Sequence, residues 1–228
     1  MAMNDKQLIE YLKQFVSQKR LAAFDRVIEY RTKYLTVLLE DIYQPHNASA
    51  VLRTCDCYGI QDVHIVENRN QYQVNPDVAL GSDKWLNMTK YEGQGNNTKK
   101  ACDKLRKNGY RIVATSLHKG NETSLLDFNL ETGKVAIMLG TEMHGLSDIA
   151  LEEADEYLKI PLYGFTESFN ISVSAAIILH EFVSRLHRSE INWQLTEKEK
   201  ESVYLNWLRK TIKKSELLEK QFREMKNS

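Results

Sequence analysis

The chain has 228 residues and a formal net charge of zero; 42% of its residues are hydrophobic and 27% are charged. These proportions are ordinary for a globular protein, and the length suffices for one sizeable domain with appendages. No apolar run reaches the roughly 18 residues that a membrane-spanning helix needs, and the charged N-terminus lacks the apolar core of a signal peptide. We therefore expect a cytoplasmic protein without a membrane partner.

Cysteine and histidine usage argues against a metal site. The three cysteines, Cys55, Cys57 and Cys102, are odd in number and lack the C-x-x-C spacing of metal ligands, which is typical of reduced thiols in the cytoplasm. The six histidines form no H-E-x-x-H motif. The sequence therefore predicts no bound metal.

The zero net charge conceals an uneven distribution. Residues 1–33 hold 7 Lys/Arg and 4 Asp/Glu, residues 185–228 hold 11 and 7, and the middle, 34–184, holds 13 and 20. Basic ends around an acidic middle indicate that the ends contact a polyanion. Solvated surface helices are the competing interpretation, because excesses of this size are common on helix faces.

Taken in chain order, the hydrophobic pattern predicts alternating strands and helices. Residues 5–31 repeat apolar side chains at helical spacing. The expected elements that follow are strand 35–42, helix 47–59, strand 63–67, helix 98–109, strand 110–116, strand 134–140, helix 147–154, strand 157–161 and helix 171–188. Asn47 and Ser147 fit as N-caps, and Gly59 and Gly109 as helix stops. From Thr196, a Thr-x-x-Glu capping box opens two more helices. The pattern predicts an α/β fold with a mostly parallel sheet and helices on both faces.

Three stretches place polar residues and glycines where strands give way to helices. They are "PHNASAVLRTCDCYG" (45–59), "IMLGTEMHGLSD" (137–148) and "IPLYGFTESFNISVSAA" (160–176). Ligands of open parallel sheets bind beyond the carboxyl ends of strands. Each stretch alone is explained by caps and turns, and Arg53 by an i,i+3 pair with Asp56.

Together, in this order, the three stretches resemble the signature motifs of the SpoU/TrmH family of SPOUT RNA methyltransferases. "N-x-S-A-x-x-R-T-C-D" resembles the first motif, "L-G-x-E-x-x-G-L-S" the second and "I-P-x-x-G-x-x-x-S-x-N-x-S-V-x-A-A" the third. The likeness covers about residues 35–185, and the ends of the chain are similar to those of tRNA-directed members. Phe169 departs from the family pattern, which usually has Leu there.

The resemblance implies a fold and partners that periodicity alone does not. The C-terminal part of the sheet domain would form a deep trefoil knot, and the protein would be a homodimer that binds S-adenosylmethionine and tRNA. We expect residues 34–188 to form the SPOUT methyltransferase domain. Residues 1–33 would be an N-terminal helical extension that binds RNA, and residues 189–228 a C-terminal helical extension.

The resemblance also assigns roles to individual residues. Thr115, Gly140, Ile160 and Phe169 would line the cofactor pocket. Arg53 would activate the ribose 2′-hydroxyl, either as a general base or, still charged, by orienting phosphate and stabilising the forming alkoxide. The remaining candidates are Asn47, which would position Arg53 or the ribose, Glu142, which would orient loops and the arginine, and Ser168 and Asn170, which would face the substrate and the dimer partner.

The expected reaction is methylation of the 2′-hydroxyl of the D-loop guanosine at tRNA position 18. Two alternatives stay open from sequence alone. One is a 2′-O-methyltransferase that acts on rRNA or on another tRNA nucleotide. The other is a catalytically silent RNA-binding dimer, which the presence of both Asn47 and Arg53 disfavours.

Overall fold

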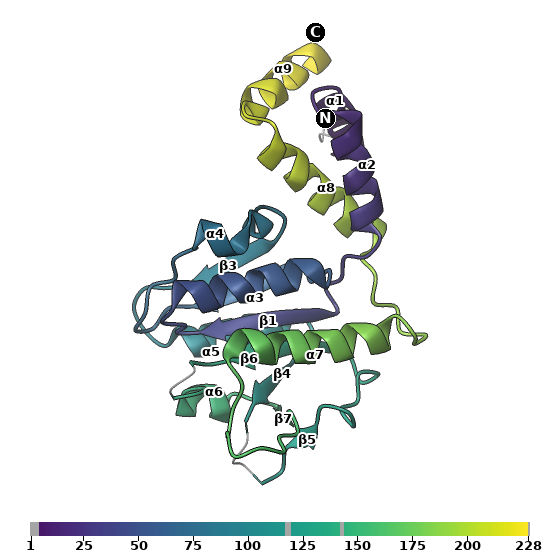
Figure 1. Cartoon of the computed structure of the whole chain (residues 1–228). Helices are drawn as coiled ribbons and strands as arrows, with labels where there is room; N and C mark the ends of the chain where they lie inside the picture. The colour runs from purple at the N-terminus through teal and green to yellow at the C-terminus, as the bar shows by residue number, and fades with distance from the viewer. Residues whose placement is uncertain (1–4, 117–119, 142–143, 228) are drawn as a thin grey trace. The chain divides into compact units, whose positions relative to one another are not determined.

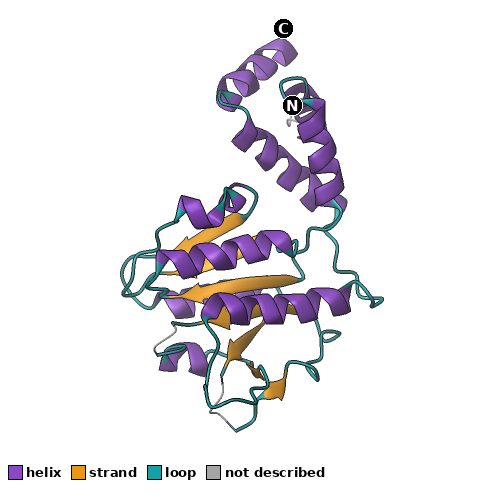
Figure 2. Cartoon of the chain, viewed as in Figure 1, coloured by secondary structure: helices purple, strands orange, loops and turns teal. Residues whose placement is uncertain are grey.

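The computed structural model describes residues 5–116, 120–141 and 144–227, and these form two units (Figure 1). Residues 32–193 make up the larger unit, which contains the strands. Both ends of the chain, residues 5–31 and 194–227, make up the other, where the described elements are helices (Figure 2). The two ends of the sequence thus belong to one helical unit.

In the larger unit, the described strands form one sheet of seven, in the order β3-β2-β1-β6-β4-β7-β5. Every pairing is parallel, as in the register Val37↔Val63 and Val37↔Ile137 around β1. The strands are β1 (Leu35–Glu40), β2 (Asp62–Val66), β3 (Asn87–Tyr91), β4 (Tyr110–Thr115), β5 (Thr123–Ser124), β6 (Lys134–Leu139) and β7 (Glu156–Lys159). The predicted parallel sheet is confirmed, and its carboxyl ends lie along one edge.

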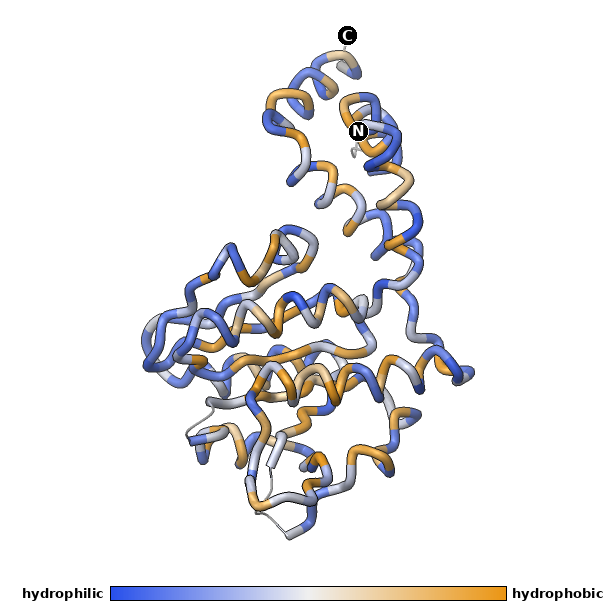
Figure 3. Tube along the Cα trace, viewed as in Figure 1, coloured by the Kyte–Doolittle hydropathy of each residue, from blue (hydrophilic) through white to orange (hydrophobic). Residues whose placement is uncertain are grey.

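Helices cover both faces of this sheet, as the sequence predicts. Successive side chains of a strand point to opposite faces, and all six residues of β1 are buried. Leu35, Val37 and Leu39 pack with α3 (Pro45–Cys57) and α7 (Ile171–Leu186). Leu38 packs in a separate core with α5 (Asn97–Lys107) and α6 (Asp148–Glu152). Figure 3 shows β1 mostly in the apolar colour, as burial on both faces requires.

Some elements depart from the sequence predictions. Helix α3 starts at Pro45 with Gln44 as its N-cap, so the prediction that Asn47 caps this helix was wrong. Proline is favoured at the first helical position because its missing N–H would have no partner there. Strand β3 was not predicted, because its sequence NMTKY is poor in apolar residues and only Tyr91 is buried. The short helices α4 (Pro76–Ala79) and η1 (Ser82–Lys84) lie between β2 and β3.

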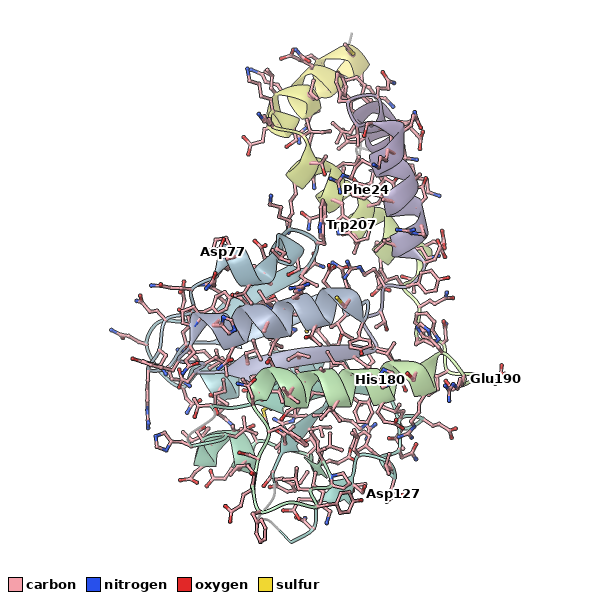
Figure 4. All side chains as sticks on the ribbon, viewed as in Figure 1. Phe24, Asp77, Asp127, His180, Glu190 and Trp207 are labelled. Carbon is pink, nitrogen blue, oxygen red and sulfur yellow. The ribbon has the colours of Figure 1, made fainter. Side chains whose placement is uncertain are left out.

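The helical unit has an aromatic core of its own. Its helices are α1 (Asp5–Lys13), α2 (Gln18–Ile28), α8 (Glu197–Thr211) and α9 (Ser215–Asn227). Phe24 of α2 and the fully buried Trp207 of α8 point toward each other, with ring centroids 5.2 Å apart (Figure 4). The predicted capping box is present, because Thr196 and Glu199 each accept the other's backbone N–H. In the described parts of both units, we find no helix with the length and apolar character needed to cross a bilayer.

Candidate active site at the carboxyl ends of three strands

Three neighbouring strands, β4, β6 and β7, end side by side at one edge of the sheet. β4 pairs with β6 on one side and with β7 on the other. Thr115 is the last residue of β4, while Gly140 and Ile160 directly follow β6 and β7. The Thr115 hydroxyl donates to the backbone oxygen of Met138 at 3.0 Å, which ties the end of β4 to β6. Three of the residues assigned to a cofactor pocket by resemblance therefore converge.

A cavity of about 610 Å³ opens at this edge. Its volume lies in the range of 300–1,000 Å³ that is usual for small-molecule sites. All four residues expected to line a cofactor pocket are on its wall, and so is Ser168. The full lining consists of Thr115, Ser116, Leu139, Gly140, Thr141, His144, Gly145, Leu146, Leu151, Leu158, Lys159, Ile160, Leu162, Glu167, Ser168, Phe169, Ile171 and Ser174. The wall thus combines aliphatic side chains with hydroxyls and backbone groups.

Gly140 is required by packing within the loop that follows β6. A Cβ built on Gly140 would lie 2.1 Å from the backbone oxygen of Gly145, far inside the closest contact that real Cβ atoms make. The approach is this close because Thr141 and Gly145 exchange two backbone hydrogen bonds, each 2.9 Å long. Gly145 has φ +66°, a left-handed conformation that favours glycine. The second motif therefore builds a tight loop on the cavity wall.

Asn47 belongs to the first turn of α3 and reaches the third motif. Its Nδ2 donates to Gln44 Oε1 at 3.0 Å, and its Oδ1 accepts from Asn170 Nδ2 at 3.2 Å. Asn170 also caps α7, because its Oδ1 accepts from the backbone N–H of Ser172 at 2.9 Å and from the Ser172 hydroxyl at 2.6 Å. The tertiary structure thus joins two candidate residues that lie 123 positions apart.

Arg53 lies apart from the cavity. Its side chain is exposed, and it is not among the residues on the cavity wall. Six residues of helix rotate it by about 240° from Asn47 and carry it about 9 Å along the axis. Within the described ranges, Arg53 makes no ion pair with Asp56 or with any other acid, so the interpretation of Arg53 as half of a surface pair lacks support. Arg53 is a guanidinium held toward solvent.

The remaining expectations fall in different places. Glu142 lies outside the described residues. Ser168 is on the cavity wall, and Phe169, which is 41% exposed, is both on the wall and open to solvent. Asn170, one residue further on, faces Asn47. Of these three consecutive residues, Ser168 and Phe169 thus contact the cavity, and Asn170 contacts the first motif.

Sequence reasoning missed Glu40, the last residue of β1, which is 2% exposed. Its Oε2 accepts from the backbone N–H of Ser147 at 2.8 Å, and its Oε1 accepts from the hydroxyl of Ser147 at 2.7 Å and from that of Thr98 at 2.5 Å. The sequence did contain a signal. The stretch LTVLLE reads as a buried strand, and its last residue is an acid. An acidic residue at the end of a buried strand, on the edge where ligands bind, is a candidate for a site residue.

Comparison with known proteins identifies relatives along nearly the whole chain. Residues 34–180 match the model of the SpoU rRNA Methylase family. A curated tRNA (guanosine(18)-2′-O)-methyltransferase of Borreliella burgdorferi is 44% identical over 212 residues, which cover 92% of this chain and 94% of that protein.

Solved structures agree with the sequence comparison. The TrmH/SpoU tRNA modifying enzyme of A. aeolicus superposes with a TM-score of 0.75 at 29% identity, over 86% of this chain and 98% of that one. The SpoU methyltransferase AviRb of Streptomyces viridochromogenes, crystallised with the cofactor AdoMet, shares the fold with a TM-score of 0.59 at 24% identity, over 72% of this chain and 65% of that one. The sheet order, the cavity built from the second and third motifs and these matches lead to one conclusion: the chain belongs to the SpoU rRNA methylase family.

Proposed function

We propose that this protein transfers a methyl group from S-adenosylmethionine to the 2′-oxygen of guanosine 18 in tRNA. The observation that carries the proposal is the cavity at the ends of β4, β6 and β7, whose wall is built from the second and third motifs of a methyltransferase family. The choice of nucleotide is supported by the 44% identical relative that is named for this reaction. The tRNA substrate also fits the cytoplasmic location expected from the sequence.

The cavity wall fits S-adenosylmethionine. Leu139, Leu158 and Ile160 offer an apolar surface to an adenine ring, while Thr115 and Ser116 offer hydroxyls. Thr115, Gly140, Ile160 and Phe169 are the residues that would hold the cofactor. S-adenosylmethionine, when bound, supplies an electrophilic methyl group on a sulfonium. The same fold holds AdoMet in AviRb, which supports this assignment.

Arg53 acts on the ribose rather than on the cofactor. A free 2′-hydroxyl is a weak nucleophile at neutral pH, so its developing negative charge needs a stabilising group. The Arg53 side chain is exposed to solvent, and a guanidinium group normally keeps its proton at neutral pH. The charged guanidinium therefore orients the phosphate backbone and stabilises the forming alkoxide. Asn47 and Asn170 link the first motif to the third.

A second protomer completes the site. Arg53 is exposed on α3 and lies off the wall of the cavity in its own chain, which is the arrangement expected if it works beside the cofactor of a partner. Tyr163 and Phe165, on the loop that supplies Leu162 and Ser168 to the wall, are almost fully exposed and form an apolar surface for a second copy to cover. We also expect the trefoil knot in the C-terminal part of the sheet domain, as the family resemblance implies.

The helical unit provides a binding surface for tRNA. Its two parts, residues 1–31 and 194–228, together hold 15 Lys/Arg and 10 Asp/Glu, a net charge of +5. Residues 32–193 hold 16 and 21, a net charge of −5. The phosphates of tRNA are therefore attracted to the helical unit and repelled by residues 32–193 as a whole. Local cations such as Arg53 can still bind phosphate on the larger unit.

The direct test is nucleoside mass spectrometry of tRNA incubated with the protein and labelled S-adenosylmethionine. We expect label in 2′-O-methylguanosine from a wild-type transcript and none from a transcript in which nucleotide 18 is adenosine. Label in ribosomal RNA or at another tRNA nucleotide would support the alternative substrates. Absence of label from every RNA, with intact cofactor binding, would support the catalytically silent RNA-binding dimer.

A further inference from the structure

We infer that Glu40 is a positioning residue that anchors the cofactor loop. We define the cofactor loop by its described residues, Gly140, Thr141 and His144–Ser147, of which all but Ser147 line the cavity. The inference rests on the proposed function, because it assumes that S-adenosylmethionine occupies this cavity. Glu40 itself is not on the cavity wall, so the inference requires no contact between Glu40 and the cofactor.

The first step is the attachment of the loop at both ends. One end continues from β6, which is paired with β1 and β4. The other end is held by Ser147, whose backbone N–H and hydroxyl both donate to the Glu40 carboxylate, at 2.8 Å and 2.7 Å. The Ser147 oxygen also accepts from the N–H of Ala150 at 3.1 Å and so caps α6. Glu40 therefore fixes both the end of the loop and the start of the helix after it.

The second step is the rigidity of the loop between these ends. Thr141 and Gly145 close it through two backbone hydrogen bonds, and Gly140 packs against the backbone of Gly145 with no room for a side chain. These contacts couple the described residues on the two sides of the closure. A shift at Ser147 is therefore carried to Gly140, on the opposite side of the closure, and to the cavity wall.

The third step is the cost of placing a carboxylate at this position. Glu40 is 2% exposed, and among the described residues it makes no ion pair with a lysine, arginine or histidine. The Glu40 carboxylate is instead stabilised by three hydrogen-bond donors. Two belong to Ser147, and the third is Thr98 Oγ1 at the start of α5. Thr98 in turn accepts from Asn68 Nδ2 at 2.9 Å. Burial of an ionisable group without a cation is costly, and a hydrophobic residue would fill the space more cheaply. The geometry indicates that the carboxylate is kept for the loop that it orients.

A matched glutamate provides the control. Glu67 directly follows β2, the strand beside β1, and its side chain is 8% exposed. It accepts from Lys90 at 2.9 Å and from the backbone N–H of Tyr72 at 3.0 Å, so its partners are not part of the cofactor loop. Glu67→Gln removes a poorly exposed carboxylate at the same edge of the sheet and leaves the cavity wall untouched.

The experiment is calorimetric titration with S-adenosylhomocysteine, the unreactive product, on the full-length protein. We expect Glu40→Gln to weaken binding about tenfold to a hundredfold, because two hydrogen bonds to a charged group are altered. Glu67→Gln should bind S-adenosylhomocysteine with wild-type affinity. Its loss of thermal stability should be similar to that of Glu40→Gln. In turnover assays Glu40→Gln should raise the KM for S-adenosylmethionine more than it lowers kcat.

A second variant, Ser147→Ala, keeps the inference testable if Glu40→Gln folds poorly, and a double-mutant cycle adds to the test if both fold. Ser147→Ala removes the hydroxyl partner alone and should also weaken binding. The loss in the double variant should be smaller than the product of the two single losses, because both act through one contact. Wild-type affinity in Glu40→Gln, an equal loss in Glu67→Gln, or strictly multiplicative losses would overturn the role of Glu40. Failure of the wild-type protein to bind the ligand would instead overturn the proposed function.

Discussion

Asn170 donates a hydrogen bond to Asn47 at 3.2 Å and thereby joins the start of α7 to the first turn of α3. The same Asn170 side chain caps α7 through its other atom, Oδ1. One residue thus carries both a local duty, which the sequence around it explains, and a long-range contact between two candidate parts of the active site.

The two duties of Asn170 can be separated by substitution. Asn170→Ser keeps an N-cap acceptor for α7 but is too short to reach Asn47, whereas Asn170→Ala removes both. We expect both variants to lose most methyl transfer, and only Asn170→Ala to lose about 1 kcal/mol of unfolding free energy as well. Single-turnover methylation and urea unfolding are the measurements. Full activity in Asn170→Ser would show that the link to Asn47 is dispensable.

Arg53→Ala should abolish methyl transfer with little change in fold or cofactor affinity. Loss of a group that stabilises charge in the transition state costs about a hundredfold or more in rate. The side chain is exposed and off the cavity wall, so its removal leaves no cavity in the core. Arg53→Lys should recover part of the rate if point charge suffices, and Asp56→Ala is the control. The measurement is the single-turnover methylation rate at saturating cofactor. A near-wild-type rate for Arg53→Ala would show that Arg53 has no catalytic role.

Gly140→Ala should destroy cofactor binding. The added methyl group would meet the Gly145 backbone at 2.1 Å, and backbone cannot rotate out of the way as a flexible side chain can. Gly164→Ala is the matched control, since the nearest atom to a Cβ there is 4.0 Å away. Titration with S-adenosylhomocysteine should show no binding for the first variant and near-normal binding for the second. Equal affinities would mean that the loop relaxes at little cost.

Cations of the helical unit should govern the salt dependence of tRNA binding. Lys213 and Lys214 are exposed between α8 and α9, and neither makes an ion pair with a described residue. Replacing both by alanine should weaken binding and reduce the slope of log K against log[salt] by up to about 2. Lys200→Ala is the control, because Lys200 already pairs with Glu29 at 2.7 Å and Glu197 at 3.3 Å. An unchanged slope would exclude these two lysines from the tRNA contact.

His64 should make the protein less stable in acid. Burial lowers the pKa of His64 to about 4, while its Nδ1 lies 2.9 Å from the Tyr91 hydroxyl. In the unfolded chain the pKa is about 6.5, so between these values the unfolded state binds more protons and stability falls as the pH drops. The loss should be about 3 kcal/mol at most. Urea unfolding at pH 7.5 and 4.5 should show a smaller difference for His64→Gln than for the wild type or the exposed His180→Gln. A full-sized difference in His64→Gln would assign the acid sensitivity to other groups.

Local sequence was sufficient for the elements whose causes are local. The buried run of β1 must lie inside a sheet covered on both faces, Gly59 and Gly109 adopt the positive φ that helix stops require, and the Thr196–Glu199 capping box forms from residues three apart. The alternation of such elements was enough to predict a parallel sheet with helices on both faces. The resemblance of the three stretches to known signature motifs was enough to predict the family.

Tertiary structure decided what depends on residues distant in the chain. Asn47 fits an N-cap by its neighbours, yet Pro45 starts the helix earlier and leaves the Asn47 side chain to meet Asn170. The acid at the end of β1 meets Ser147, 107 positions later, only because the fold brings the two together. Hydrophobic period and capping act within one or two turns of chain, whereas the partners of a buried polar group are chosen by the packing of whole strands and helices.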